Sequence, residues 1–359
     1  MEQEISTTLR DLLNHETPFF AYRRPEEDNL HLGRITTARS FKYDMLEQMP
    51  EQAGFVMVPF RTGEARAWWL GTEKMEAVKL PQKERRPNQS PVQNQEEDPE
   101  SFASYAEQFR QMMSALTAGK VQKVILSRTI TLNRDLKQDL PGIFLRLTQR
   151  YPAAFCYLVA SPQTGIWLGA SPELLFAQHG QQCTTVSLAG TRSSEGSPSD
   201  WTAKEREEQG LVSSYIDQLL GDFGVSTYQK NGPEIIKAGN LTHLKTSYSF
   251  KQSEIHKLAQ FVEALHPTPA LCGEPKMQAM ALIRKVEQHQ RLYYGGFMGP
   301  LGNADCHLFV NIRCMNTAPG HSTLYVGGGL TRQSELHSEW NETVMKSRTL
   351  LSVLSPRQA

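Results

Sequence analysis

The sequence lacks the features that mark several large classes of protein. Its 359 residues carry 38 Lys plus Arg against 38 Asp plus Glu, and no long basic stripe interleaved with aromatic residues occurs, so the charge pattern of a nucleic-acid-binding protein is missing. No stretch reaches the roughly 18 consecutive apolar residues that span a bilayer. The start, MEQEISTTLRDLLNHETPFF, lacks the basic and apolar segments of a secretory signal. We therefore expect a cytoplasmic protein with a small-molecule partner and no membrane or nucleic-acid partner.

Cysteine is scarce, and its arrangement favours neither zinc binding nor a disulfide framework. The five cysteines are scattered and form no CxxC pair, which indicates reduced thiols in a cytosolic setting. A nucleophilic cysteine is conceivable, but small buried apolar side chains are the commoner explanation. The five positions are Cys156, Cys183, Cys272, Cys306 and Cys314.

A polar interval divides the chain. Residues 1–80 mix short apolar runs, such as GFVMVPF and ARAWWLG, with turn residues, which predicts strands and loops with few helices. The interval LPQKERRPNQSPVQNQEEDPE has almost no apolar anchor, so we expect a mobile surface loop at about 81–100. The predicted organisation is a β-rich amino-terminal portion, 1–100, within the same body as a core of residues 101–359.

Beyond the interval, apolar spacing predicts both helices and strands. From Phe102 to Leu116 apolar residues recur at helical spacing, and Gly119 ends that helix. Further helices are expected at about 201–222, 254–265, 275–290 and 335–354. Runs that are apolar on both faces predict strands inside a sheet: VQKVILSRTITL, FCYLVAS, GIWLGAS, CTTVSLAG, HLFVNIRCM and STLYVGGG. The fold class is therefore mixed, α/β or α+β.

Two residues are candidates for proton transfer. Lys123 has apolar neighbours on both faces of its predicted strand, where burial would disfavour the charged form and let a neutral amine act as a base. The alternative is a strand-edge lysine that reaches solvent. Glu173 follows a Ser-Pro turn after GIWLGA, where a carboxyl with a raised pKa could donate a proton into a cleft. The alternative is a glutamate that caps a loop.

Two glutamate pairs are candidates for a metal site. Glu205 with Glu208, and Glu339 with Glu342, have i,i+3 spacing, so each pair lies on one face of a predicted helix and two packed helices would direct four carboxylates into one space. Like charges repel at such a distance unless a cation lies between them, and oxygen ligands without Cys or His favour Mg²⁺ over zinc. Against this, glutamate pairs on solvated helices are very common.

A glycine run and an arginine indicate an anion site. LYVGGGLT ends a strand in three glycines, which lets backbone N–H groups approach an anion, but the dinucleotide and ATP-phosphate patterns are missing. Arg313, in VNIRCM, lies within an apolar strand, and burying an unpaired guanidinium is costly. We expect a carboxylate partner for it, either an internal Asp or Glu or a ligand.

Ten motifs occur in a specific order: KVILSR, GASPEL, SLAGTR, EREEQGLV, LTHLKT, LHPTPALCGEPK, YYGGFMG, FVNIRC, YVGGGL and EWNETVMKS. Over roughly residues 101–354 they resemble the chorismate-utilising enzymes, which include anthranilate synthase component I, aminodeoxychorismate synthase, salicylate synthase and isochorismate synthase. The resemblance implies an α+β fold in which layered β-sheets form a sandwich flanked by helices, with a central active-site cleft and 101–359 as the chorismate-binding catalytic core.

Two positions distinguish activities within this family. Aminodeoxychorismate synthases carry a lysine where SLAGTR has Ala189, and anthranilate synthases read AGT where this chain has TPA, so Ala270 departs from them. HPTPAL matches the isochorismate synthases best. The resemblance therefore implies an isomerase that converts chorismate to isochorismate with Mg²⁺ and feeds menaquinone or siderophore biosynthesis, as a monomer and without an amidotransferase subunit. A salicylate synthase, an ammonia-using enzyme and a non-catalytic binding protein are the alternatives.

The resemblance also implies roles for individual residues. Lys123 would remove a proton from the water that attacks C2 of chorismate, and Glu173 would protonate the departing C4 hydroxyl. In each glutamate pair the second member would bind Mg²⁺ and the first would act through metal-bound waters. The substrate-binding positions would be Gly190, Thr191, His243, Ala270, Leu271, Tyr294, Arg313, Gly327 and Lys346.

Overall fold

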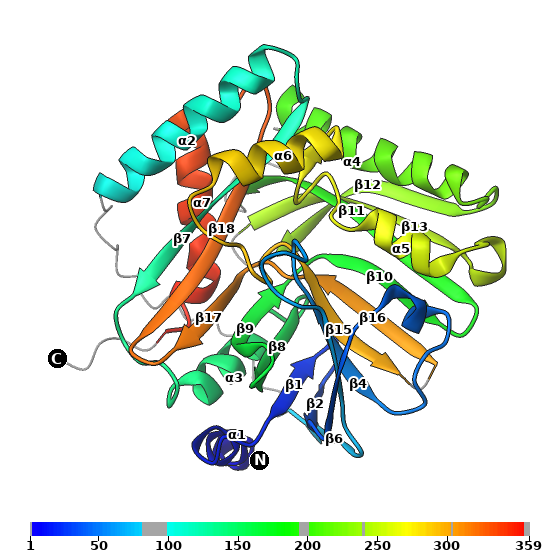
Figure 1. Cartoon of the computed structure of the whole chain (residues 1–359), viewed down its shortest axis with the longest axis vertical. Helices are drawn as coiled ribbons and strands as arrows, with labels where there is room; N and C mark the ends of the chain where they lie inside the picture. The colour runs from blue at the N-terminus through cyan, green and yellow to red at the C-terminus, as the bar shows by residue number, and fades with distance from the viewer. Residues whose placement is uncertain (1, 81–98, 194–200, 239–240, 303, 355–359) are drawn as a thin grey trace.

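The computed structural model describes residues 2–80, 99–193, 201–238, 241–302 and 304–354. Within these ranges it is an α+β fold of two antiparallel sheets with helices around them (Figure 1), so the predicted fold class is confirmed. The interval at about 81–100 was expected to be a mobile surface loop. Its residues 81–98 lie outside the part of the chain that the structure describes. No helix in the described part is long and apolar enough to cross a membrane.

The first sheet contains strands from both the beginning and the end of the chain. They are β1 (Phe19–Arg23), β2 (Asn29–Arg34), β6 (Met75–Lys79), β7 (Lys123–Leu132), β8 (Phe155–Ser161), β9 (Gly165–Ser171), β14 (Gly273–Glu274), β17 (Cys314–Ala318) and β18 (His321–Leu330). Their order in space is β14-β7-β18-β17-β9-β8-β1-β2-β6. The longest register here joins β7 to β18 and sets Gly329 opposite Ile125.

The second sheet is built in the same mixed way. Its strands are β3 (Thr37–Ser40), β4 (Gly54–Val58), β5 (Trp68–Gly71), β10 (Leu174–His179), β11 (Gln182–Ser193), β12 (Gln229–Ala238), β13 (Leu241–Lys251), β15 (Phe297–Gly302) and β16 (Asp305–Val310). Their order is β12-β13-β11-β10-β16-β15-β4-β5-β3. The strands of residues 1–80 therefore join both sheets, and the division at about residue 100 stays a prediction.

An aromatic core lies between the two sheets. The rings of Phe155 on β8 and Phe309 on β16 stack with their centroids 4.2 Å apart, and Phe55 on β4 stacks on Phe155. Trp167 on β9 extends the same buried cluster toward Tyr325 on β18. Because alternate residues of each strand point to one face, these side chains join the inner faces of the sandwich, and the outer faces are left for helices.

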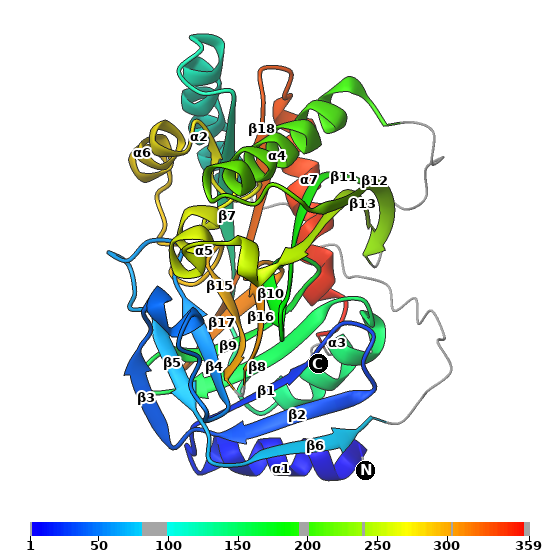
Figure 2. The same ribbon diagram turned by 90° about the vertical axis from the view of Figure 1, so that its right-hand side faces the viewer.

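Helices cover the outer faces (Figures 1 and 2). Helices α1 (Glu2–Asn14) and α3 (Leu140–Arg150) pack on the first sheet, and α4 (Ala203–Asp222) and α5 (Leu258–Leu265) pack on the second. Helices α2 (Pro99–Thr117), α6 (Lys276–Val286) and α7 (Leu336–Leu351) surround β7 and β18. A capping box between Thr202 and Glu205 fixes the start of α4. Single-turn helices lie at Tyr43–Leu46 and Gln252–Glu254.

The chain crosses from one sheet to the other at two adjoining places. Between β9 and β10 it leaves the first sheet, and Glu173 lies in this crossing. Between β16 and β17 it returns, and Arg313 lies in that crossing. The crossings are hydrogen-bonded to each other, since the N–H of Val310 donates to the carbonyl of Glu173 at 2.9 Å and that of Ala170 to the carbonyl of Arg313 at 3.1 Å.

Most predicted elements are present, but one expectation was wrong. Residues 2–80 are rich in strands, as expected, and their one α-helix, α1, buries Ile5, Leu9 and Leu12 along one face. The run HLFVNIRCM was expected to be one strand, yet it contains the end of β16 and the start of β17 in different sheets. Arg313 therefore lies in a break with φ +51° and not inside a strand.

Candidate active site

A cavity lies where the two crossings meet the glycine-rich part of β18. Its wall is made by segments that are far apart in the sequence, including both crossings, β7, β11, β18, α4 and α7. Ten of the residues predicted for the site line it: Glu173, Gly190, Glu208, His243, Ala270, Leu271, Tyr294, Arg313, Gly327 and Lys346. The structure therefore brings together most of the positions that the motifs indicated.

Glu173 is a buried carboxylic acid in this cavity. Its residue is 3 % exposed, and its backbone N–H donates to Ser171 Oγ at 3.3 Å. Burial raises the pKa of Glu173 to about 8, although Lys123, Lys346 and Arg313 act in the opposite direction. At neutral pH the carboxyl therefore holds a proton that it can donate to a ligand in the cavity.

Lys123 is fully buried at the start of β7 and contacts an acid of α4. Its Nζ lies 3.0 Å from Oε1 of Glu208, so the alternative of a lysine that reaches solvent is wrong. Burial alone would raise the pKa of Glu208, but Lys123 and more distant lysines lower it. The residue predicted as a base and one predicted metal ligand are thus in contact.

Two glycines of β18 make room for the carboxylates. A Cβ on Gly329 would collide with Oε1 of Glu208, and a Cβ on Gly328 would lie 3.4 Å from Oε2 of Glu339 and 3.7 Å from Oε1 of Glu342. The glycine run was expected to bring backbone N–H groups close to an anion. That role stays a prediction, and the structure shows in addition that the run lets side chains of α4 and α7 approach the strand.

Lysines balance the acids of α4 and α7. Glu342 pairs with Lys346, one turn later on α7, and Glu339 pairs with Lys204, at the start of α4. Burial would lower the pKa of Lys204, but Glu339, Glu342 and Glu208 raise it. The ammonium of Lys204 is therefore close enough to carboxylates of both helices for them to raise its pKa. This is expected if Glu208 of α4 and the glutamate pair of α7 face a common region. Lys204 was not predicted, since a lysine at the start of an acidic helix is an ordinary surface residue.

The acids have the chemistry of a magnesium site. Oε2 of Glu339 is buried and has no hydrogen-bond partner among the described residues. Burial, followed by the charge of Glu342, raises the pKa of Glu339 to about 7, and a cation would relieve that repulsion. Within the described part of the chain no three or more His, Cys, Asp or Glu side chains converge on one point. Mg²⁺ commonly takes only one or two carboxylates and keeps several waters, so the residues fit this ion.

Arg313 has no internal carboxylate partner among the described residues. It is 7 % exposed, its Nη1 has no hydrogen-bond partner in those ranges, and no ion pair joins it to Asp or Glu there. Burial lowers the pKa of Arg313 to about 10, which still leaves it charged at neutral pH. The described residues thus supply no internal acid for Arg313, and a carboxylate of a ligand would be complementary to it.

His243 lies beside this arginine in a neutral form. Burial, assisted by the charges of Arg313 and Lys346, lowers the pKa of His243 to about 3. Its Nδ1 lies 3.1 Å from the carbonyl of Gly190, which assigns the proton to Nδ1. The ring is therefore a neutral part of the cavity wall, and it adds no charge to the cation set of Arg313 and Lys346.

Five predicted positions are not among the residues that line the cavity: Lys123, Glu205, Glu339, Glu342 and Thr191. The carboxylate of Glu205 accepts a hydrogen bond from the backbone N–H of Thr202 at 2.8 Å, so it faces the start of its own helix. The side chain of Thr191 lies outside what the structure describes. Sequence reasoning also missed the apolar wall residues Ile125, Leu188, Ile312 and Tyr325, because their spacing is that of any core residue.

The cavity of this sandwich holds a neutral carboxyl and an arginine without a carboxylate partner in the described residues, and a buried lysine contacts one of its acids. These groups define a site for acid–base chemistry on a small anionic ligand. A family model described as "Chorismate binding enzyme" matches residues 61–355, and the chain belongs to this family.

Known proteins of this kind are similar in sequence and structure. Isochorismate synthase EntC of Escherichia coli K12 is 31% identical over 261 residues, which cover 68% of this chain and 66% of EntC. The aligned part thus spans just under two thirds of that relative. The structure of MenF, the menaquinone-specific isochorismate synthase from Escherichia coli, matches with a TM-score of 0.79 at 18% identity over 97% of this chain and 91% of MenF. The structure of a putative 2,3-dihydroxybenzoate-specific isochorismate synthase, DhbC from Bacillus anthracis, matches with a TM-score of 0.78 at 21% identity over 96% of this chain and 99% of that chain.

Proposed function

We propose that the protein is an isochorismate synthase, an isomerase that converts chorismate to isochorismate with Mg²⁺. The observation that carries the proposal is one cavity lined by Glu173, Arg313 and Glu208, with Lys123 in contact with Glu208. Glu173 holds a proton at neutral pH, and Arg313 has no internal carboxylate partner in the described residues. The likeness to EntC supports the same reaction. The product would feed menaquinone or siderophore biosynthesis; of the matched structures, one is named menaquinone-specific and the other 2,3-dihydroxybenzoate-specific.

The reaction exchanges one water for another on the chorismate ring. Nζ of Lys123 takes a proton from a water, whose oxygen forms a bond to C2. The ring double bonds shift, and the bond from C4 to its hydroxyl breaks. Glu173 donates its proton to that hydroxyl, which leaves as water. The atoms balance without an oxidant or a second substrate.

Substrate binding uses the charges that the cavity leaves available. Arg313, with the backbone of Gly327 and the hydroxyl of Tyr294, would hold the pyruvyl carboxylate. Glu208 and Glu342 would hold Mg²⁺ directly, which when bound would neutralise the ring carboxylate. Glu339 would contribute through waters, whereas Glu205, whose carboxylate caps the start of α4, would not. The other predicted contacts are Gly190, Thr191, His243, Ala270, Leu271 and Lys346.

Product analysis tests the proposal. We expect the purified protein, given chorismate and Mg²⁺, to form isochorismate, which nuclear magnetic resonance identifies directly. Excess EDTA should stop the reaction, and added Mg²⁺ should restore it. Fluorescent salicylate as the main product would instead indicate a salicylate synthase, and a requirement for ammonia would indicate an aminating enzyme. Binding of chorismate without any conversion would overturn the enzymatic proposal.

We also propose that the chain works as a monomer and without an amidotransferase subunit. The reaction needs water in place of ammonia, so no glutamine-hydrolysing partner is required. Light scattering of the active protein tests this, because a larger mass would indicate an oligomer.

A further inference from the structure

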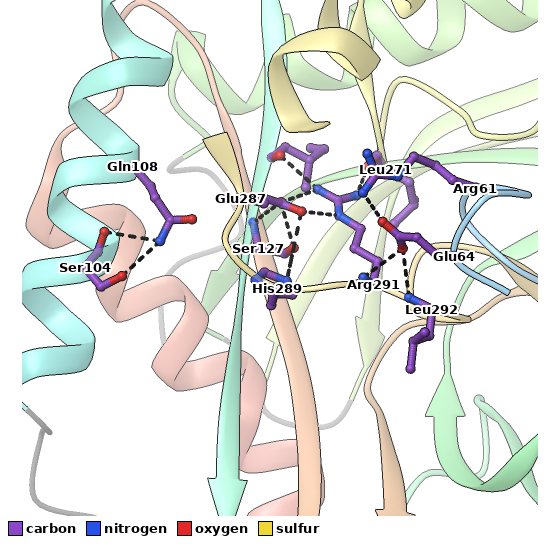
Figure 3. Close-up of polar contacts among 11 residues, drawn as sticks. Arg61, Glu64, Ser104, Gln108, Ser127, Leu271, Glu287, His289, Arg291 and Leu292 are labelled. Atoms are coloured by element: carbon purple, nitrogen blue, oxygen red, sulfur yellow. Dashed lines mark hydrogen bonds and ion pairs between the residues drawn. The ribbon is translucent and has the colours of Figure 1, made fainter. Parts of the chain in front are cut away.

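A buried ion pair lies next to the cavity, and the reaction described above does not use it. Arg291 is 0 % exposed, and its Nε and Nη2 donate to both carboxylate oxygens of Glu287 at 2.8 and 2.6 Å. The same guanidinium donates from Nη1 to the carbonyl of Leu271 at 2.9 Å and from Nη2 to the carbonyl of Ile125 at 3.1 Å. Figure 3 shows Glu287 and Arg291 between Ser127 and Leu271.

Further hydrogen bonds hold the two partners in place. Oε1 of Glu287 accepts from the backbone N–H and the hydroxyl of Ser127, at 2.9 and 2.8 Å. Oε2 of Glu64 accepts from the backbone N–H groups of Arg291 and Leu292, at 3.0 and 3.1 Å. Leu292 has φ +51°, a conformation that surrounding contacts must maintain. Both ends of the ion pair are therefore fixed by the backbone around them.

The network attaches two segments of the cavity wall to the side chain of Arg291 and a third to its backbone. Ile125 and Leu271 line the cavity, and Lys123 lies two residues before Ile125 on β7. Tyr294 also lines it, and its N–H donates to the carbonyl of Arg291 at 2.8 Å. A shift of the guanidinium would move β7 and the turn before β14 with respect to one another.

Stability alone does not account for such an arrangement. A buried ion pair often contributes no more to stability than apolar residues of the same size, because both charges must be desolvated. The planar fork of arginine, in contrast, fixes several acceptors in defined directions, which the single ammonium of a lysine cannot do. Here one fork reaches a carboxylate and two carbonyls, and its plane also lies over the ring of Phe60, 4.2 Å away.

We propose that Arg291, oriented by Glu287, is a positioning residue for the reaction: it fixes Ile125 and Leu271, and through β7 it sets Lys123 against the substrate ring. This inference rests on the proposed function, since it assigns Lys123 the base role. It concerns residues that do not touch the substrate.

The test replaces the planar guanidinium of Arg291 by the ammonium of a lysine, which keeps the positive charge. In Arg291→Lys the ammonium can still pair with Glu287 but cannot hold both carbonyls, so kcat should fall by about 10²-fold, as for a misplacement of about 1 Å, with a much smaller change in KM. Arg23→Lys is the matched control. Arg23 is 2 % exposed and donates to the carbonyls of Tyr151 and Ala154, but unlike Ile125 and Leu271 these two residues do not line the cavity. Equal kcat values for the two variants would overturn the inference.

A double variant separates positioning from general damage to the fold. In a Lys123→Ala background, Arg291→Lys should lower the residual kcat little further, because the group that it positions is already gone. Losses that multiply would contradict the inference. Thermal unfolding checks that each variant folds, and if Arg291→Lys does not, Glu287→Gln is measured in the same cycle with the same expected result. A wild-type protein that makes no isochorismate would refute the proposed function, whereas an active wild type with a fully active Arg291→Lys would refute only this inference.

Discussion

Two carboxyl groups at the cavity have opposite protonation because their neighbours differ. Burial raises the pKa of Glu173 to about 8. Among the described residues, no charged side chain forms an ion pair with Glu173 at contact distance that would oppose this shift. Glu208 is in contact with Lys123, and its pKa is lowered although burial opposes this. One carboxyl is therefore a proton donor and the other an anionic ligand, a division that environment alone creates.

The raised pKa of Glu173 predicts the alkaline limb of the pH profile. The acid must be protonated to act, so kcat/KM should fall above about pH 8, by about tenfold per unit. Lys123, Lys346 and Arg313 are the charged groups that act on Glu173, and all three lower its pKa. Glu173→Gln removes the titrating group, so it should lose at least about 10²-fold in rate and show no such limb. A limb that persists in this variant would assign it to another residue.

The local pattern of the sequence identified candidate residues but did not decide between their alternatives. It left open whether Lys123 is buried or reaches solvent and whether Glu173 enters a cleft or caps a loop, and the order of the motifs supplied their proposed roles. The structure shows that both residues are buried. Arg313 was predicted to need a carboxylate, but for a wrong reason, since it lies in a break between strands. Lys204 and the pair of Glu287 with Arg291 gave no signal, because their partners are distant in the sequence or depend on which backbone carbonyls lie nearby.

At the scale of elements, the site depends on the two crossings and on the glycines of β18. The crossings place Glu173 and Arg313 between the sheets, and the glycines allow α4 and α7 to bring their acids to the strand. Apolar spacing predicted β7, β18 and these helices. It could not predict the crossing inside HLFVNIRCM, because an apolar run looks the same whether it stays in one sheet or changes sheets.

Replacing a glycine of β18 tests this element directly. The Cβ of Gly329→Ala would collide with Oε1 of Glu208 and lie 3.1 Å from Cε of Lys123, so the pair must shift and kcat should fall at least about tenfold. Gly221→Ala, in α4, is the control, because a Cβ there meets nothing within 4 Å and alanine favours a helix. Steady-state kinetics and thermal unfolding compare the two. Full activity in Gly329→Ala would show that the close approach is not needed.

At the scale of the whole molecule, the sandwich is assembled from distant parts of the chain. Strands from residues 1–80 lie at or near the edges of both sheets, while the strands that build the cavity come from the matched region 61–355. The motifs predicted that region and its architecture well. The amino-terminal strands and α1 carry no motif, and their positions follow only from the aromatic core and the helix packing that the complete fold provides.

The central claim is that water adds to the ring beside Lys123 while the hydroxyl near Glu173 departs. The most direct measurement is the reaction in H₂¹⁸O with chorismate and Mg²⁺, followed by mass spectrometry of the isochorismate. The account predicts one ¹⁸O atom per product molecule, located on C2. Isochorismate without the label would mean that the original hydroxyl migrates within the substrate, and it would contradict the roles given to both residues.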